Sequence, residues 1–197
     1  MRFNKNLATV HAYLCADGYV IRNPKTQNHK YYHTGFRNTN LILLKDFQEK
    51  FQNYFKIKPR LVEGERCIVQ SKKTFQKLTE NYSYYSYHWK MPGLSKLHSK
   101  FWLRAFFDCE AWVECQKGKS RTIRLECVNF NGIKSIQNAL LRFNVESKIK
   151  TRLRKERTIY RMNICGLDDL KKFQTHIGFH HPNKKIKLDN AIYSYKS

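Results

Sequence analysis

The chain contains one pattern twice, and this repeat limits the fold more than any other feature. Residues 10–18 (VHAYLCADG) form an apolar nonapeptide with small residues at its third and seventh positions and an acid, Asp17, at its eighth. Residues 103–111 (LRAFFDCEA) have the same pattern, with Glu110 at the eighth position. The two acids are 93 residues apart, close to half of the 197-residue chain. The nonapeptides therefore predict two copies of one folding unit.

Three further matches recur in the same order at nearly the same offset. The run beginning at Phe55 (FKIKPRL) recurs at Phe143 (FNVESKI), an offset of 88 residues. The other two matches pair Asn38 with Asn129 and Lys90 with Lys184, at offsets of 91 and 94 residues. We expect two repeats, at 1–97 and 98–197, related by a pseudo-twofold axis.

Hydrophobic periodicity predicts an α+β fold in which each repeat has the order αββαββα. Each nonapeptide is expected to lie in a short helix, followed by two strands, at 19–23 and 30–37 in the first repeat and at 112–116 and 121–128 in the second. An amphipathic helix (40–54 or about 133–141), a second hairpin and a last helix (about 72–81 or 167–177) complete each unit. The tyrosine-rich segment 82–99 breaks the periodicity and is expected to link the repeats.

The charge of the chain predicts a polyanionic partner. Lysine and arginine number 38 against 15 aspartate and glutamate, which gives a net charge of +23, while 41% hydrophobic residues are enough for a folded protein. In the expected strand 145–154, apolar residues alternate with four cations, Lys148, Lys150, Arg152 and Arg154. Alternation puts these cations on one face of a sheet. Such a face is either simply solvated or the wall of a groove that follows phosphates, and the total charge favours the groove.

The remaining composition argues against export and against a membrane segment. No apolar run approaches the roughly 20 residues of a membrane helix, and no signal-peptide core follows the N-terminus. The six cysteines form no C-x-x-C pair and are expected to be reduced thiols. We therefore expect an intracellular protein, in the cytoplasm of an archaeon or a bacterium or in an organelle. The cluster His176, His180 and His181 has partial zinc-site spacing, but a nearby fourth ligand is missing, which favours a solvated or phosphate-facing cluster.

The two matched acids need a cation. Burial of two core helices accounts for the small residues Ala12 and Ala105 but not for Asp17 and Glu110. A carboxylate at the C-terminal end of a helix meets the unfavourable end of the helix dipole, and two such carboxylates at a helix interface also repel each other. Divalent metal ions held by carboxylates and phosphate oxygens would remove this repulsion. The sequence therefore favours a metal-dependent site at the junction of the repeats.

The nonapeptides resemble the paired motifs of LAGLIDADG homing endonucleases, specifically the single-chain kind with both repeats in one polypeptide, and are similar to those of archaeal intron-encoded members. The resemblance covers nearly the whole chain. Position six of the first motif is Cys15 rather than an acid, and position nine of the second is Ala111 rather than glycine. The acids at the eighth position are retained in both motifs.

This resemblance implies a monomeric, Mg²⁺-dependent endonuclease that cuts both strands of a long asymmetric site in double-stranded DNA. Asp17 and Glu110 would bind two or more divalent ions together with Ala16 and Cys109, and Mn²⁺ or Ca²⁺ could substitute for binding. The attacking water would be supported by Asn38 and Lys90 in one half and by Asn129 and Lys184 in the other. The residue chemistry also allows helix capping for the asparagines and simple phosphate contacts for the lysines.

Each four-stranded sheet would then cover one major groove. The residues expected to contact DNA are Arg22, Lys30, Tyr32, Arg37 and Arg60 in the first repeat, and Gln116, Arg121, Arg124, Lys148, Lys150, Arg152 and Arg154 in the second. Three alternatives stay open: a maturase that binds intron RNA, a non-catalytic DNA-binding regulator on the same fold, and a ribosomal-type RNA-binding protein. Retention of both acids favours the endonuclease over the first two, and charge spread through patterned strands disfavours the third.

Overall fold

The computed structural model describes residues 1–24, 26–28, 31–116 and 120–195. The first half of the chain contains α1 (Lys5–Ala16), β1 (Gly18–Arg22), β2 (Tyr32–Arg37), α2 (Leu41–Phe55), β3 (Arg60–Val62), β4 (Arg66–Gln70) and α3 (Lys72–Thr79). The second half contains α4 (Lys96–Glu110), β5 (Ala111–Cys115), β6 (Arg121–Cys127), α5 (Phe130–Leu141), β7 (Lys148–Arg154), β8 (Arg157–Cys165), α6 (Leu167–His176) and α7 (Pro182–Tyr193). Both halves thus contain the predicted αββαββα order.

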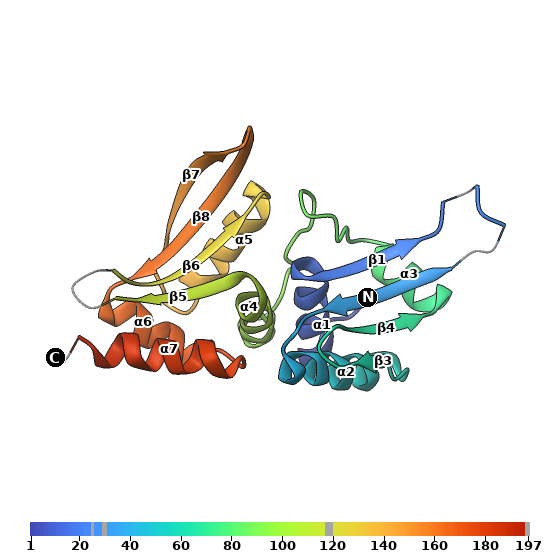
Figure 1. Ribbon diagram of the computed structural model, residues 1–197, viewed down its shortest axis with the longest axis horizontal. Coiled ribbons are helices and arrows are strands. Elements are labelled where there is room, and N and C mark those ends of the chain that lie inside the picture. Colours follow the sequence, from blue (N-terminus) through green and yellow to red (C-terminus); the bar gives the residue numbers. More distant parts are fainter. Residues whose placement is uncertain (25, 29–30, 117–119, 196–197) are drawn as a thin grey trace.

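The two halves share one sheet topology. Each has a four-stranded antiparallel sheet, with strand order β1-β2-β4-β3 in the first half and β5-β6-β8-β7 in the second. Helices α1 and α4 pack against each other in the middle of the molecule, with one sheet on either side (Figure 1). The α+β fold with two matching halves predicted from the repeat is therefore confirmed.

Side-chain caps and small residues explain why the central helices form and pack at these positions. Asn4 and Ser95 cap the N-termini of α1 and α4 with their side-chain oxygens. Ala12 and Ala105 are buried, so the helices present little bulk to their surroundings at these positions. The indole nitrogen of Trp102 on α4 donates a hydrogen bond to His11 Nδ1 on α1 at 3.1 Å, deep in the core. This bond joins the two halves. His11 is neutral, because burial lowers its pKa to about 3.

The helices cover one face of each sheet and leave the other open. In the first sheet, Thr34 and Phe36 point into the core, as do Ile123, Leu125 and Ile164 in the second. We call the opposite face of each sheet its open face. The strand register then assigns every strand residue to one face or the other.

Two features differ from the expected element list. Helix α7 was not predicted, since its buried residues, Leu188, Ala191 and Ile192, give only a weak apolar stripe; Pro182 occupies its first turn, where proline is well tolerated. Leu153, expected on an apolar face, is 78% exposed, because the β7–β8 hairpin extends beyond the part of the sheet that the helices cover (Figure 1).

The junction of the repeats falls between α3 and α4. Helix α4 begins at Lys96, so the expected boundary after residue 97 lies inside its first turn. We retain the two-repeat division as a proposal and put the linker at 80–95.

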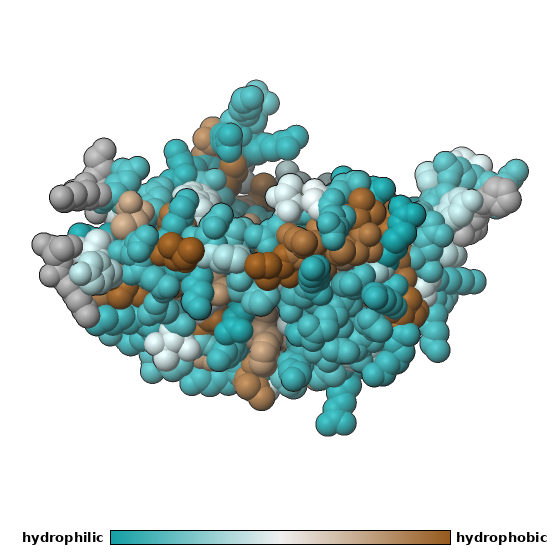
Figure 2. Space-filling model, turned by 60° about the horizontal axis from the view of Figure 1, so that its bottom comes forward, coloured by the Kyte–Doolittle hydropathy of each residue, from teal (hydrophilic) through white to brown (hydrophobic). Residues whose placement is uncertain are grey.

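The surface is mainly hydrophilic in the view of Figure 2, with scattered hydrophobic residues between the charged ones. Among the described residues, none of the helices combines the length and apolarity required to cross a bilayer.

Candidate active site and nucleic-acid interface

Asp17 caps the C-terminus of α1, just before β1 begins. Its backbone carbonyl accepts a hydrogen bond from Arg37 N at 3.2 Å, which fixes the end of β2 beside it. The side-chain amide of Asn38, immediately after β2, donates to Asp17 Oδ2 at 3.2 Å. Desolvation raises the pKa of Asp17, while hydrogen bonds with Cys109 and Asn38 and the charge of Lys184 oppose the rise. Asn38 and Asp17, 21 residues apart in sequence, are thus brought into contact.

Glu110 is the last residue of α4, and its carboxylate interacts with the charge of Asp17. Burial raises the pKa of Glu110 to about 7, the negative charge of Asp17 adds to the rise, and the charge of Lys184 opposes it. Asp17 and Glu110 thus lie at the C-terminal ends of the two packed central helices, at the seam between the halves, where the charge of Asp17 reaches Glu110. In the described part of the chain no three His, Cys, Asp or Glu side chains gather as a metal site, so a metal held by these two carboxylates would need further oxygen ligands from outside the set.

Lys184 on α7 lies at the C-terminal end of α4. Its ammonium donates to the backbone carbonyls of Phe107, Asp108 and Cys109 at 3.4, 2.5 and 3.1 Å. A cation is favourable there because the last carbonyls of a helix have no partners within the helix. Desolvation lowers the pKa of Lys184, and its attraction to Cys109, Asp108, Asp17 and Glu110 opposes the fall. Cys109, one of the residues expected to bind metal, thus has a backbone carbonyl that accepts a hydrogen bond from Lys184.

Asp108 positions the segment that carries Lys184, a role that the sequence analysis missed. It is 1% exposed, and its Oδ1 accepts hydrogen bonds from the backbone nitrogens of His180 and His181 at 3.0 and 2.9 Å. Burial raises its pKa to about 7 despite these bonds. The signal was present in the sequence, because Asp108 occupies position six of the second nonapeptide, where the first has Cys15.

His181 also joins the two halves. Its Nε2 lies 3.2 Å from Nδ2 of Asn40, the residue that caps α2. The histidine cluster noted in the sequence therefore contributes one member to a contact between repeats, close to Lys184.

Asn129 and Lys90 are not brought to Glu110 in the same way. Asn129 is 4% exposed and caps α5, because its Oδ1 accepts from Gly132 N at 2.9 Å and its Nδ2 donates to the Trp89 carbonyl at 2.7 Å. Neither bond leads to an acid of the site, so the helix-cap alternative describes Asn129. Asn38 also uses both ends of its side chain, since its Oδ1 accepts from Asn40 N at 2.9 Å, but its other bond goes to Asp17. Lys90 is exposed and lines a surface pocket beside Asn129. In the described residues no hydrogen bond or ion pair joins either of them to Glu110. The two halves of the site are therefore unequal.

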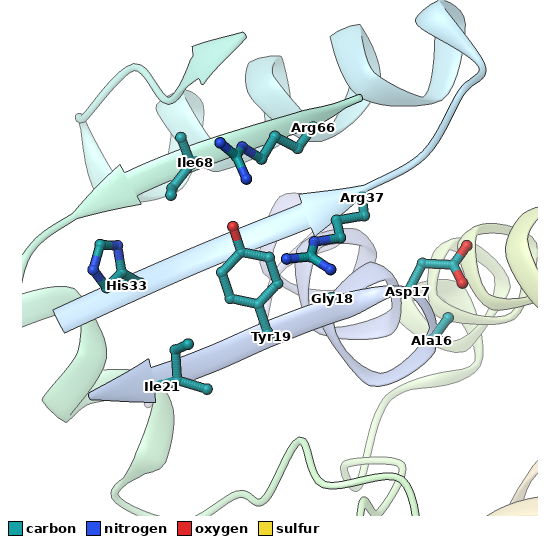
Figure 3. Close-up of a pocket in the computed structure, with 9 residues that line it drawn as sticks. All are labelled: Ala16, Asp17, Gly18, Tyr19, Ile21, His33, Arg37, Arg66 and Ile68. Atoms are coloured by element: carbon teal, nitrogen blue, oxygen red, sulfur yellow. The ribbon is translucent and has the colours of Figure 1, made fainter. Parts of the chain in front are cut away.

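The open face of the first sheet forms a shallow pocket that starts at Ala16 and Asp17 (Figure 3). Its arginines are Arg37, which lies over the ring of Tyr19 at 5.3 Å, and Arg66. The register adds Arg60 and Gln70 to this face, opposite Ile68 and His33. Of these residues, the sequence analysis named only Arg37 and Arg60 as DNA contacts and missed Tyr19, His33, Arg66 and Gln70.

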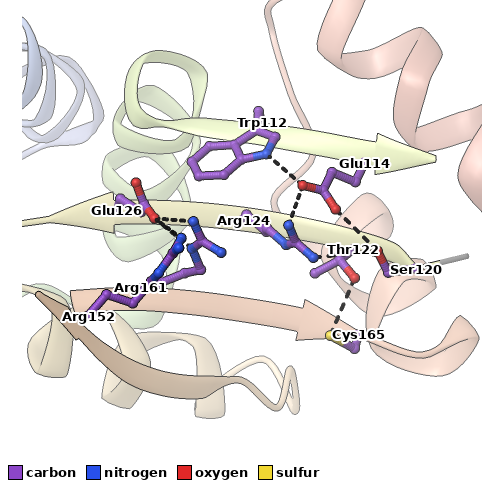
Figure 4. A network of polar contacts seen from close by, with 9 residues as sticks. All are labelled: Trp112, Glu114, Ser120, Thr122, Arg124, Glu126, Arg152, Arg161 and Cys165. Atoms are coloured by element: carbon purple, nitrogen blue, oxygen red, sulfur yellow. Dashed lines mark hydrogen bonds and ion pairs between the residues drawn. The ribbon is translucent and has the colours of Figure 1, made fainter. Parts of the chain in front are cut away.

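The open face of the second sheet carries the basic strand. Lys148, Lys150, Arg152 and Arg154 lie opposite Asn163, Arg161, Ile159 and Arg157 of β8. All four cations therefore share the open face, as the alternation predicts. Arg124 and Arg161 lie on the same face in the two central strands, and each contacts a carboxylate (Figure 4).

The register corrects the placement of three expected DNA contacts. Tyr32 lies on the helix face of the first sheet, with its ring 5.1 Å from that of Phe75 on α3, and Arg22 pairs with it on that face. Arg121 shares the core parity of Ile123 and binds the end of α7, where its Nε donates to Ser194 Oγ at 2.6 Å. Gln116 is exposed just after β5, and Lys30 lies outside the described residues.

The comparisons with known proteins support the fold. Residues 99–178 match a family model described as a LAGLIDADG-like domain. Solved structures show that the whole chain has the two-repeat LAGLIDADG fold. The structure of I-DmoI in complex with DNA and Ca has a TM-score of 0.67 and 16% identity, covering 93% of this chain and 98% of that one.

Two further structures extend the likeness. The homing endonuclease I-WcaI bound to its DNA recognition sequence has a TM-score of 0.62 and 18% identity, over 95% of this chain and 88% of that one. The N-terminal LAGLIDADG domain of WhiA has a TM-score of 0.57 and 12% identity, over 96% and 88%. At these identities the structures establish the LAGLIDADG fold.

One curated protein is more similar in sequence over a shorter stretch. The replication factor C small subunit of Thermococcus kodakarensis is 32% identical over 82 residues, which are 42% of this chain and 9% of that protein's length. The chain thus spans a small part of this relative.

Proposed function

We propose that this LAGLIDADG protein is a site-specific DNA endonuclease that hydrolyses one phosphodiester bond in each strand of a duplex and depends on a divalent metal, Mg²⁺ above all. The observation that carries the proposal is the meeting of Asp17 and Glu110 at the seam, between two basic open faces. Like charges held together at partly buried positions are costly unless a cation binds between them. The solved LAGLIDADG relatives in complex with target DNA and with Mn, Mg or Ca support the same chemistry.

The residues present fit a hard divalent cation. Two carboxylates whose pKa values are raised by burial form an oxygen-donor set without a full complement of partners, which suits Mg²⁺ completed by water, the Ala16 carbonyl and phosphate oxygens. When bound, the metal would activate water and neutralise charge on the phosphate. The raised pKa of Glu110 implies that metal binding displaces a proton below about pH 7.

The neighbouring side chains supply orientation and charge. Asn38, held by Asp17, can orient a water molecule through its amide. Lys184 puts an ammonium at the C-terminal end of α4, where it favours negative charge at the phosphate. In the second half, Asn129 was expected to play the part of Asn38, but it caps α5 instead. Neither of the expected residues Asn129 and Lys90 contacts Glu110 as Asn38 contacts Asp17. We therefore propose Asp17, Glu110, Asn38 and Lys184 as the catalytic set.

The open faces supply the DNA surface. Arg37, Arg60, Lys148, Lys150, Arg152 and Arg154 are proposed as phosphate or base contacts, together with Arg66, which the structure adds. The two faces differ in nearly every residue, so the preferred site should be asymmetric. One chain supplies both acids, and we propose that it acts as a monomer.

Cleavage by acid-to-amide variants tests the proposal. Duplexes that the protein selects from a randomised pool are incubated with Mg²⁺ and with wild type, Asp17→Asn or Glu110→Gln, and with the surface control Glu80→Gln. We expect wild type and Glu80→Gln to cut both strands, and the two site variants to bind the duplex without cutting it. Undiminished cutting by both site variants would move the active site elsewhere. Binding without cutting by wild type would instead favour the non-catalytic regulator.

A further inference from the structure

The two open faces differ in a way that the endonuclease proposal does not require. The open-face strand positions of the first sheet hold no carboxylate among the described residues, and Arg66 contacts an acid, Glu65, only from the turn before β4. The second sheet holds two carboxylates on its open face, Glu114 on the edge strand β5 and Glu126 on the central strand β6. A carboxylate on a surface that binds a polyanion lowers affinity, so these two acids need another reason.

Each acid holds one arginine of the central strands (Figure 4). Glu114 Oε1 accepts from Arg124 Nη1 and from the Trp112 indole at 3.3 Å, and Glu114 Oε2 accepts from Ser120 Oγ at 3.1 Å. Glu126 Oε1 accepts from Arg161 Nε and Nη2 at 2.6 and 2.5 Å. Arg152 lies farther from the same oxygen, at 3.7 Å.

These pairs fix arginine geometry more than they stabilise the fold. Their side chains are all between 21% and 25% exposed, and ion pairs that water reaches contribute little to stability. A guanidinium has five donors in a rigid fork, so the carboxylate that takes the Nε edge of Arg161 leaves other donors free. Arg124 donates from Nη1 to Glu114 and from Nη2 to Ser120 Oγ at 3.4 Å, which leaves the second hydrogen of each of these nitrogens. A free guanidinium edge held in one orientation matches the O6 and N7 acceptors of guanine in the major groove.

The edge strand β7 presents two lysines that have no carboxylate partner among the described residues. Lys148 and Lys150 on the edge strand β7 lie opposite Asn163 and Arg161 of β8. Point charges on flexible stems suit phosphates, whereas fixed arginines suit base edges. The second sheet thus has two arginines held by carboxylates of its own strands, an arrangement that the described strand positions of the first sheet do not repeat.

Resting on the proposed DNA-binding function, we propose that Glu114 and Glu126 are specificity-determining residues, which hold Arg124 and Arg161 to read guanines in the half-site under the second sheet. The acids also reject wrong partners, because a misplaced phosphate or base acceptor would face a carboxylate. The first sheet would contribute affinity with less discrimination.

The test compares sequence preference with affinity. Wild type and the double variant Glu114→Gln, Glu126→Gln each select duplexes from a randomised DNA pool in the absence of divalent metal, and affinities are then measured for the preferred duplex, for single mismatches and for unselected duplex. We expect the double variant to lose preference in one half-site, with mismatch discrimination there reduced about tenfold or more. Its affinity for unselected duplex should stay equal or rise, since two negative charges are removed.

The control carries the same charge change elsewhere. Glu49→Gln, Glu80→Gln alters exposed acids on the helix side of the molecule and should keep the wild-type preference. Arg124→Lys, which keeps the charge and loses the fork, should repeat part of the loss. A double variant that gains affinity but keeps full mismatch discrimination would overturn the inference. Failure of wild type to enrich any sequence would overturn the site-specific function itself, and that result is visible without any substitution.

Discussion

At the scale of single residues, Glu110 is destabilising in the metal-free protein. Its pKa rises from an ordinary 4.5 to about 7, so the folded chain keeps a proton that the unfolded chain loses. The free energy of unfolding therefore falls as pH rises from about 4.5 to about 7. This rise corresponds to at most about 3 kcal/mol, and solvent access to the site reduces the figure.

The substitution Glu110→Gln should remove this loss of stability at high pH. Thermal melting of both proteins in the presence of a chelator tests the prediction. We expect the variant to melt above wild type at about pH 8 and close to it at about pH 4. Addition of Mg²⁺ should raise the melting temperature of wild type at about pH 8 and have little effect on the variant. A variant that is less stable than wild type at about pH 8 would contradict the electrostatic reading of the seam.

Lys184 is proposed to stabilise the end of α4 and to assist cleavage. Substitution of the neighbouring Lys185 serves as a control, because it removes the same charge without removing these contacts. Lys184→Met removes the cation from the α4 terminus and should cost about 1 kcal/mol of stability and about a hundredfold in cleavage rate. Lys185→Met, an exposed position in the same turn, should change neither by more than a few-fold. Cleavage rates at saturating DNA and urea melts measure both quantities. Equal losses in the two variants would remove Lys184 from the catalytic set.

At the scale of elements, the paired asparagines should behave differently although they align in the repeat. Asn129→Ala removes the cap of α5 and the partner of the Trp89 carbonyl, so it should lower stability by about 1–2 kcal/mol and leave the cleavage rate of the folded protein within a few-fold. Asn38→Ala should reduce cleavage with a smaller effect on stability. Unfolding curves and single-turnover cleavage separate the outcomes, and a larger catalytic loss in Asn129→Ala would reverse the assignment.

The contrast between Asn38 and Asn129 shows which features of the site can be predicted from sequence. The eighth-position acids could be placed because a repeat fixes both helix ends at once, and the cations of β7 because alternation is strict there. Arg121 was wrongly expected on the DNA side, although its alternation with Ile123 and Leu125 along the strand already put it on the core side. For Tyr32, the neighbouring sequence does not indicate which face it occupies, and the pairing of its strand is needed. Asn129 shows the limit of the repeat, because alignment finds equivalent positions and the contact with Trp89 decides the role.

At the scale of the whole molecule, the net charge is +23, but only the cations on the open faces should make DNA affinity depend on salt concentration. Six such cations have no carboxylate partner among the described residues and are available for phosphates: Arg37, Arg60, Lys148, Lys150, Arg154 and Arg157. If each neutralises one phosphate, the logarithm of the binding constant should fall with the logarithm of salt concentration with a slope of about −5. Affinity should then drop about a thousandfold between about 50 and 200 mM salt.

Position, rather than total charge, should set this slope. Lys148→Gln, Lys150→Gln should make it shallower by about 2, because two counterion-releasing contacts are lost. Lys72→Gln, Lys73→Gln removes the same charge from the first turn of α3, on the helix side of the first sheet, and should leave the slope within about half a unit of wild type. Binding titrations of one selected duplex across the salt range supply all three slopes. Equal changes in the two variants would mean that DNA responds to the overall electrostatic field of the protein, and the open faces would then define no path for the DNA.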